Sequence, residues 1–334
     1  SNMPKCPLRG GMKFGSLTLD MHFDDWGRQT RGDRIIKDSL QALVKNDNKK
    51  LSTYITKACW HIRDALPLAI SIDNFIDAHR DNEKIAICGK LAIVRSILDA
   101  EKNSLLYTDI YKKTDLSYHD LENTWYLSFF QVLTENCETK DLYDRFESIA
   151  LVIFNYDRCV EHFLYHALQN YYKISKEESA ELVKQINIYH PYGSVGSLPW
   201  YENGALVNFG YEPNSKQLME LSKKIKTFTE GTDPEESEIE LIQSHLSQAD
   251  KIVFLGFAFH KLNMQIITSS PAENKKLQRK CYATTFGISD SDKEVIRKQI
   301  RDLFHGTHPD FTPVDMGNLT CHDFFSHFWR SLAF

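Results

Sequence analysis

The spacing of hydrophobic residues divides the chain into a helical first part and a mixed second part. Before residue 148, apolar residues recur every three or four positions, which predicts amphipathic helices and no convincing strand. The clearest of these stretches are RIIKDSLQALVK (34–45), LSTYITKACWHIRDAL (51–66), IAICGKLAIVRSILDAE (85–101) and DLENTWYLSFFQVLTENC (120–137). The pattern predicts a mainly helical region over residues 1–147 that packs on the rest of the protein.

From residue 148 onward, short apolar runs end in turn residues and are each followed by a helical pattern. These runs are SIALVIFNYD (148–157), INIYHPYG (186–193), KIVFLGFAFH (251–260) and CYATTFGISD (281–290). Strands that alternate with helices predict parallel pairing, with helices covering both faces of the sheet. The predicted fold class is therefore α/β, with a Rossmann-like parallel sheet over residues 148–334 and a large helical N-terminal or insertion region. The two regions can form one compact domain.

The composition argues against several classes of protein function. The 334 residues are 42% hydrophobic, enough for a sizeable core, and the net charge of −5 offers no basic surface to nucleic acid. No apolar run approaches the roughly 20 residues that a membrane span needs, so no membrane partner is expected. The seven cysteines are widely spaced without a CxxC pair, which favours a reducing cytoplasm over a disulfide framework or a zinc ribbon.

Polar residues follow the predicted strands at their carboxyl ends. In an open parallel sheet, ligands bind at these ends, where helix N-termini offer unpaired N–H groups. Asn155 and Asp157 follow the first strand, His190 stands on the last residue of the second, and Gly256 follows the third. The competing interpretation is structural, because Asn and Asp are common helix N-caps and a lone histidine is usually a packed residue. After the fourth strand, Ser289 can cap the next helix.

Three of these segments together resemble the bacterial branch of the sirtuin-like family of NAD-binding proteins. FNYD (154–157) stands where that family has a strand-end Asn-x-Asp, HPYG (190–193) where it has the catalytic His-Gly, and FLGFAFHKLN (254–263) where it has a glycine-containing loop. SIDNFID (71–77), followed by a helix with Gly89 and Lys90, resembles the helical insertion of the bacterial branch. The resemblance covers most of residues 70–300.

The resemblance implies an NAD glycohydrolase that cleaves the bond between nicotinamide and ribose, as related bacterial anti-phage defence proteins do. It implies that Asn155 positions the ribose and an attacking water, that Asp157 contacts nicotinamide or ribose, and that His190 is a general base. The residues implied for NAD binding are Gly193, Gly256, Phe257, Asn263 and Ser289. The implied ligand is NAD or a nucleotide like ADP-ribose, no metal is required, and a homo-oligomer or a defence-complex partner fits the same family.

One expected part of the family is absent from the sequence. Sirtuin-like domains open with a strand and a Gly-Ala-Gly turn that holds the pyrophosphate, whereas Gly10, Gly11 and Gly15 follow no predicted strand and are interpreted as a loop. Either the sequence begins after that strand or this member has lost it. The alternative function is therefore a catalytically inactive nucleotide-binding, sensing or scaffold domain. The zinc-binding cysteines of deacylating sirtuins are also missing, so protein deacylation is not expected.

Other side chains have simpler interpretations. His162 and His166 lie four apart on a predicted helix, a spacing that can hold a metal, but the apolar stripe on that helix favours packing. Trp125 and Tyr126 are interpreted as helix core rather than a base-stacking platform, and Cys159 as a buried structural thiol.

Overall fold

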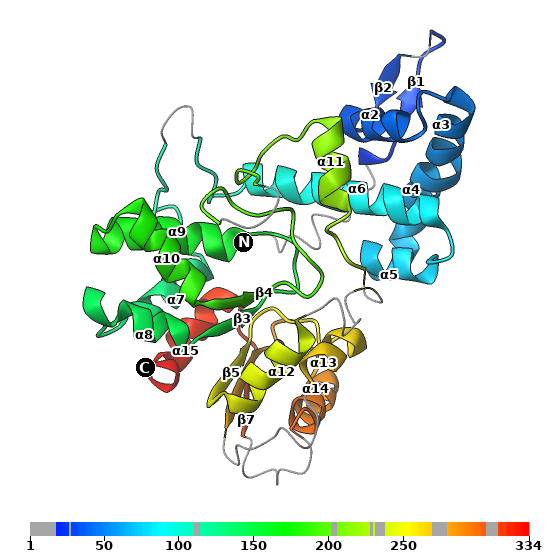
Figure 1. Cartoon of the computed structure of the whole chain (residues 1–334). Helices are drawn as coiled ribbons and strands as arrows, with labels where there is room; N and C mark the ends of the chain where they lie inside the picture. The colour runs from blue at the N-terminus through cyan, green and yellow to red at the C-terminus, as the bar shows by residue number, and fades with distance from the viewer. Residues whose placement is uncertain are drawn as a thin grey trace. The chain divides into compact units, whose positions relative to one another are not determined.

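The computed structural model describes residues 18–26, 28–109, 114–201, 206–227, 230, 238–268, 279–304 and 313–333. The glycines at 10, 11 and 15 therefore lie outside the described residues. Within this part, the protein is a mixed α/β structure with many helices and small parallel sheets (Figure 1).

The chain forms two compact units, and each combines segments that are distant in sequence. Unit 1 contains Ser1–Leu116, Asn155–His162 and Tyr192–Gly231, and unit 2 contains Ser117–Phe154, Phe163–Pro191 and Thr232–Phe334. The division at residue 148 that the hydrophobic pattern predicts stays a prediction.

Unit 1 is built mainly of helices. They are α2 (Arg34–Leu43), α3 (Asn48–Tyr54), the π-helix η1 (Ile55–Cys59), α4 (Trp60–Ala65), the 3-10 turn η2 (Leu66–Leu68), α5 (Ile72–Ala78), α6 (Glu83–Lys102) and α11 (Ser215–Ser222). The central helix α6 begins after Asn82, whose side chain accepts a hydrogen bond from the backbone N–H of Ile85 at 3.4 Å. Ile85, Leu91 and Leu98 of this helix are fully buried.

A short hairpin in unit 1 corrects the expectation that no strand precedes residue 148. Strand β1 (His22–Phe23) pairs antiparallel with β2 (Gln29–Arg31). These strands are two and three residues long and largely polar, so they give no apolar alternation to detect.

Unit 2 contains two parallel sheets. Strand β3 (Ala150–Val152) pairs with β4 (Asn187–Tyr189), and β6 (Lys280–Thr284) lies between β5 (Lys251–Phe254) and β7 (Val314–Gly317). The predictions of β3, β4, β5 and β6 are confirmed, although β4 ends at Tyr189, so His190 is the first residue after the strand rather than its last. Strand β7 was not predicted.

Helices accompany these sheets. They are α7 (Trp125–Thr134), η3 (Thr139–Asp141), α8 (Leu142–Glu147), α10 (Lys176–Gln185), α12 (Ile239–Gln248), α13 (Lys261–Ile267), α14 (Asp290–Asp302) and α15 (Cys321–Leu332). Helix α9 (Cys159–Tyr172) begins among the residues of unit 1 and ends among those of unit 2.

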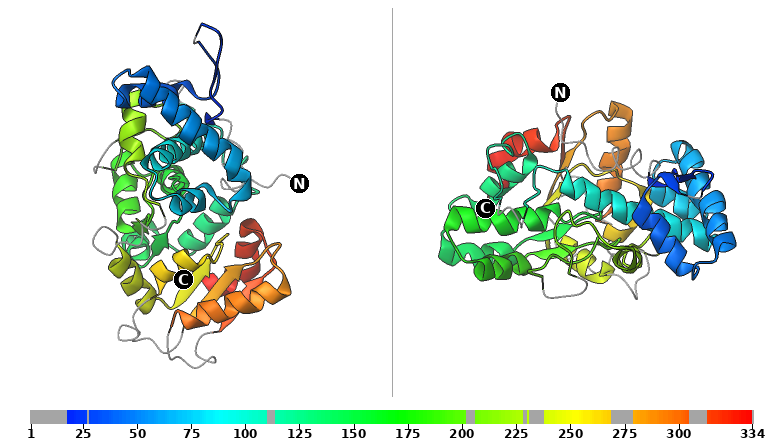
Figure 2. Two further views of the ribbon diagram at one scale, coloured as in Figure 1. Left: turned by 90° about the vertical axis from the view of Figure 1, so that its right-hand side faces the viewer. Right: turned by 90° about the horizontal axis from the view of Figure 1, so that it is seen from above.

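The core of unit 2 lies where α7 and α15 pack against the central strand. Phe324 and Phe325 of α15 join Tyr282 of β6 and Val132 of α7 in one buried cluster. Helix α15, at the red end of the colour bar, packs along α7 (Figure 2). Strand β6 is hydrogen-bonded to a strand on each side, and four of its five residues are buried. It is therefore the central strand of this sheet.

Among the helices in the described ranges, none has the length and apolar character that a bilayer crossing requires.

Candidate functional site

The carboxyl ends of β3 and β4 lie side by side in unit 2. The strands are parallel, with Val152 opposite Tyr189, and the backbone N–H of Ile153 donates to the carbonyl of Tyr189 at 2.8 Å. The pairing therefore continues one residue past β3. His190 comes directly after β4, and Asn155 comes three residues after the end of β3.

The hydroxyl group of Thr284, on β6, binds the backbone at the end of β5. The backbone N–H of Gly256 donates to Thr284 Oγ1 at 2.8 Å, and that hydroxyl donates to the carbonyl of Phe254 at 3.3 Å. Gly256 has φ +58, and Phe259 also has a positive φ of 50, which is rare for a bulky residue. Glycine adopts this conformation without cost, whereas Phe259 is strained by it, and strained backbone of this kind clusters at functional sites.

Phe257, which the resemblance assigned to NAD binding, belongs to an aromatic cluster. Its ring centroid lies 5.5 Å from Phe254, 5.0 Å from Phe259 and 5.1 Å from Phe154. Phe154 follows β3, whereas Phe257 follows β5. The cluster thus brings the ends of strands from the two parallel sheets of unit 2 together, and it gives Phe257 a packing role.

Of the other two residues of unit 2 implied for NAD binding, one lies in a helix and the other caps a helix. Asn263 lies in α13 with only 8% of its surface exposed. Ser289 is exposed and caps α14, since its Oγ accepts a hydrogen bond from the backbone N–H of Asp292 at 3.1 Å. The prediction that Ser289 caps this helix is confirmed.

Burial alternates along the turn that follows β3. Tyr156 and Arg158 are buried, whereas Asn155 and Asp157 are partly exposed. Asp157 Oδ1 accepts a hydrogen bond from the backbone N–H of Cys159 at 3.2 Å, at the start of α9. This hydrogen bond supports the structural interpretation of Asp157 as a residue at the N-terminus of a helix.

Tyr156 is held by a buried carboxyl group. Its hydroxyl forms a short hydrogen bond with Asp73 of α5 and lies 3.1 Å from the backbone carbonyl of Lys226. Burial raises the pKa of Asp73 above its ordinary value. The hydroxyl of Tyr156 donates to Asp73 Oδ1, and this hydrogen bond opposes the rise in the pKa of Asp73.

Arg158 forms a buried ion pair with Glu101 of α6. The two side chains are 2% and 1% exposed, and the contacts are Nη2–Oε2 at 2.6 Å and Nε–Oε1 at 3.1 Å. The guanidinium also donates to the carbonyls of Val207 at 2.6 Å and Asn208 at 3.2 Å, and Gly210 N–H donates to Glu101 at 2.9 Å. Burial raises the pKa of Glu101, and the positive charge of Arg158 opposes that rise. The pair ties the turn to a second backbone segment of unit 1.

Gly193 has a structural reason to be glycine. Its φ is +79, and a Cβ placed there would lie 2.0 Å from the carbonyl oxygen of Lys224. Two residues later, the backbone N–H of Val195 donates to the carbonyl of Tyr156 at 3.1 Å. The segment that follows His190 is therefore connected, within unit 1, to the turn that carries Asn155 and Asp157.

The candidate residues are divided between the two units. Asn155, Asp157 and Gly193 belong to unit 1, whereas His190, Gly256, Phe257, Asn263 and Ser289 belong to unit 2. Within unit 2, β3 pairs with β4, and the ring of Phe154 after β3 contacts the ring of Phe257 after β5. Within unit 1, they fasten the Asn155–Arg158 turn to the segment after His190. The anchors Asp73 and Glu101 were not predicted from the sequence.

The remaining sequence candidates have packing roles. His162 stacks on Phe209 with ring centroids 4.0 Å apart, and its Nε2 donates to the carbonyl of Leu106 at 3.0 Å. Trp125 packs on Phe325 in unit 2. Cys159 is partly exposed, which corrects the expectation of a buried thiol, because it stands on the first turn of α9. Among the residues that the structure describes, no three His, Cys, Asp or Glu side chains are grouped to hold a metal.

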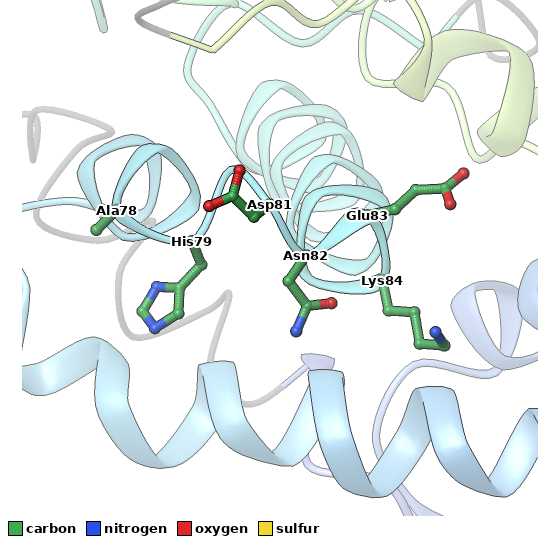
Figure 3. Close-up of a pocket in the computed structure, with 6 residues that line it drawn as sticks. All are labelled: Ala78, His79, Asp81, Asn82, Glu83 and Lys84. Atoms are coloured by element: carbon green, nitrogen blue, oxygen red, sulfur yellow. The ribbon is translucent and has the colours of Figure 1, made fainter.

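A separate polar pocket of about 520 Å³ lies in unit 1, where α5 ends and α6 begins (Figure 3). Its lining residues are Ala78, His79, Asp81, Asn82, Glu83 and Lys84. His79 Nδ1 donates to the carbonyl of Phe75 at 2.9 Å, which fixes its ring. None of the residues predicted for NAD binding or catalysis lines this pocket.

No protein-family model, no curated protein and no solved structure matches this chain. Membership of the sirtuin-like family therefore stays a prediction from the motifs.

Proposed function

We propose that this protein is a sirtuin-like NAD glycohydrolase that releases nicotinamide and ADP-ribose. The observation that carries the proposal is the arrangement of strand ends. His190 directly follows β4, Asn155 follows its parallel partner β3, and the glycine loop after β5 packs on the residue before Asn155 through the rings of Phe257 and Phe154. Carboxyl ends of parallel strands are where open α/β sheets bind nucleotides.

We also propose that the two parallel sheets of unit 2 belong to one Rossmann-like sheet in the order β4-β3-β5-β6-β7, with helices on both faces. The hydrogen-bonded pairs are β3–β4 and β5–β6–β7. The ring contact of Phe154 with Phe257 supports placing β3 next to β5. In that order, β4 is added on one side of β3 and β5 on the other side, so the boundary between β3 and β5 is a topological switch point. Such switch points are the usual nucleotide-binding sites of open α/β sheets.

The proposed reaction follows from the chemistry of the three polar residues. The bond between ribose C1′ and the nicotinamide nitrogen breaks, its electron pair neutralises the pyridinium, and the sugar passes through an oxocarbenium-like state. Asn155 can orient the ribose and the attacking water through its amide. His190 can accept the proton that the water loses, because an imidazole titrates near neutral pH. Asp157 would stabilise the positive sugar, in addition to its contact with the N–H of Cys159.

The first test is nicotinamide release from NAD by the full chain. Asn155→Ala and His190→Ala should each lower kcat by about a hundredfold or more, the range reported for loss of an acid–base or positioning group. His119→Ala is the matched control, since His119 is an exposed histidine whose Nδ1 lies 2.8 Å from Glu122, three residues along the chain. Absence of nicotinamide from wild-type protein, or equal rates in His190→Ala and His119→Ala, would contradict the proposal.

A catalytically inactive nucleotide-binding, sensing or scaffold domain is the second candidate. It is favoured by the capping contacts of Asp157 and Ser289, which give both residues a structural use. In that case, titration with ADP-ribose or NAD should show binding without turnover, and His190→Ala should leave the affinity unchanged. A cytoplasmic role in bacterial anti-phage defence, as a homo-oligomer or with a partner, belongs to the enzyme proposal through the resemblance alone.

A further inference from the structure

On the basis of the proposed function, we propose that Tyr156 and Arg158 are positioning residues for the proposed reaction. In this role they hold Asn155 and Asp157 in the geometry that the chemistry requires. Their partners Asp73 and Glu101 come from the helical N-terminal region, which would make that region a working part of the enzyme rather than a cover.

The first step is that buried and partly exposed side chains alternate along the turn. Tyr156 and Arg158 turn into the interior of unit 1, and Asn155 and Asp157, one residue before each, remain partly exposed. The turn is too short for its residues to move independently, because Asn155 is bonded directly to Tyr156 and Asp157 lies between Tyr156 and Arg158. Fixing Tyr156 and Arg158 therefore also restricts the directions in which Asn155 and Asp157 can point.

The second step is that the two anchors reach different elements. Tyr156 bonds to Asp73 of α5, and Arg158 bonds to Glu101 of α6. One anchor alone would leave the turn free to rotate about it. Two anchors separated by two residues restrict both the position and the rotation of the turn.

The third step concerns the choice of polar anchors. Burying an arginine, a glutamate and an aspartate carries a desolvation cost, and apolar residues of similar size would hold the chain at least as strongly. Hydrogen bonds differ from apolar contacts because they set direction. A bidentate guanidinium–carboxylate pair fixes orientation in a plane, which apolar packing does not do. The use of polar anchors here is thus explained by a need for orientation.

The test compares Tyr156→Phe and Asp73→Ala with Asp73→Asn in the full chain, at a temperature well below the Tm of each variant. Tyr156→Phe removes only the hydroxyl, and Asp73→Ala removes its partner. Both should lower kcat for nicotinamide release by about tenfold to a hundredfold, the effect of a displacement near 1 Å, with KM changed less than kcat. Asp73→Asn should restore most of kcat, because its amide oxygen can still accept the hydrogen bond from Tyr156.

Ser179→Ala is the matched control for stability. Ser179 is a fully buried residue of unit 2 whose hydroxyl donates to the carbonyl of Tyr165 at 2.7 Å, so its loss also removes one buried hydrogen bond. This variant should have a lower Tm than the wild-type protein and an unchanged kcat. Wild-type kcat in Tyr156→Phe and Asp73→Ala would overturn the positioning role and leave the proposed function standing. Equal loss of kcat in Ser179→Ala would overturn the positioning role as well. A wild-type chain that releases no nicotinamide would overturn both.

Discussion

Replacing Arg158 with methionine should lower the free energy of unfolding by about 3–5 kcal/mol, the usual cost of removing one partner of a buried ion pair. Arg158 is 2% exposed, and Glu101 is 1% exposed. Without the guanidinium, the Glu101 carboxylate keeps the backbone N–H of Gly210 at 2.9 Å but loses its bidentate contact. The carbonyls of Val207 and Asn208 lose a donor as well.

A double replacement separates the pair from the packing around it. In Arg158→Met with Glu101→Leu, no uncompensated charge remains, so the loss should be smaller than in Arg158→Met alone. The sum of the two single losses should exceed the loss in the double variant by more than about 1 kcal/mol, as expected for residues in direct contact.

The measurement is urea unfolding at pH 7, followed by tryptophan fluorescence. Trp60 reports on unit 1, since its Nε1 donates to the carbonyl of Met21 at 3.0 Å. Lys223→Ala is the matched control because the Lys223–Glu220 pair lies on the exposed surface of the same unit, and its loss should change little. A loss in Arg158→Met no larger than in Lys223→Ala would refute the reasoning, as would single losses that simply add.

Three further outcomes are expected. Gly193→Ala and Gly287→Ala share a conformational cost of about 1–2 kcal/mol, because both glycines have positive φ (+79 and +74). Gly193→Ala should lower the free energy of unfolding by urea more than Gly287→Ala does. The new Cβ at Gly193 would lie 2.0 Å from the carbonyl oxygen of Lys224, whereas nothing lies within 4 Å of a Cβ at Gly287. Equal losses of free energy would contradict this. Ser289→Ala should cost about 1 kcal/mol as the loss of a helix cap, and Ser289→Asp should retain most of that stability in the same titration. The pKa of Asp73 is raised by burial, so the free energy of unfolding should fall as pH rises from about 4 through the higher folded pKa, and Asp73→Asn should remove that part of the slope in unfolding curves taken across this range.

Much of the fold could be predicted because its strands carry their own signal. The runs that became β3, β5 and β6 are apolar and bounded by turn residues, which identifies them without knowledge of their partners. Strand β7, with the sequence VDMG, has no such pattern. It pairs with β6 along four residues, from Val314 opposite Cys281 to Gly317 opposite Thr284, so its conformation depends on its partner rather than on its own residues.

The candidate site was predicted in part for a similar reason. Asn155 and Asp157 could be identified because they follow β3 within five residues in sequence. Their anchors were not visible, since Tyr156 and Asp73 are 83 positions apart and Arg158 and Glu101 are 57 apart. One signal was available for Glu101, which stands three positions after Leu98 on the buried face of α6. A carboxylate at a core position of an amphipathic helix requires a partner, although the pattern does not say which one.

Asn155 and His190 are supported by different contacts, and this leads to one more expected outcome. Asn155 belongs to the turn anchored by Tyr156 in unit 1, whereas His190 follows β4 in unit 2. If His190 is the general base, the fall of kcat/KM toward acid pH reports its protonation. Tyr156→Phe should then lower kcat/KM at every pH while leaving the midpoint of that fall in place, because the contacts of β4 are unchanged. Nicotinamide release measured from pH 5 to 9 would show this, and a midpoint displaced by Tyr156→Phe would mean that the hydroxyl acts on the proton transfer itself rather than on the position of Asn155.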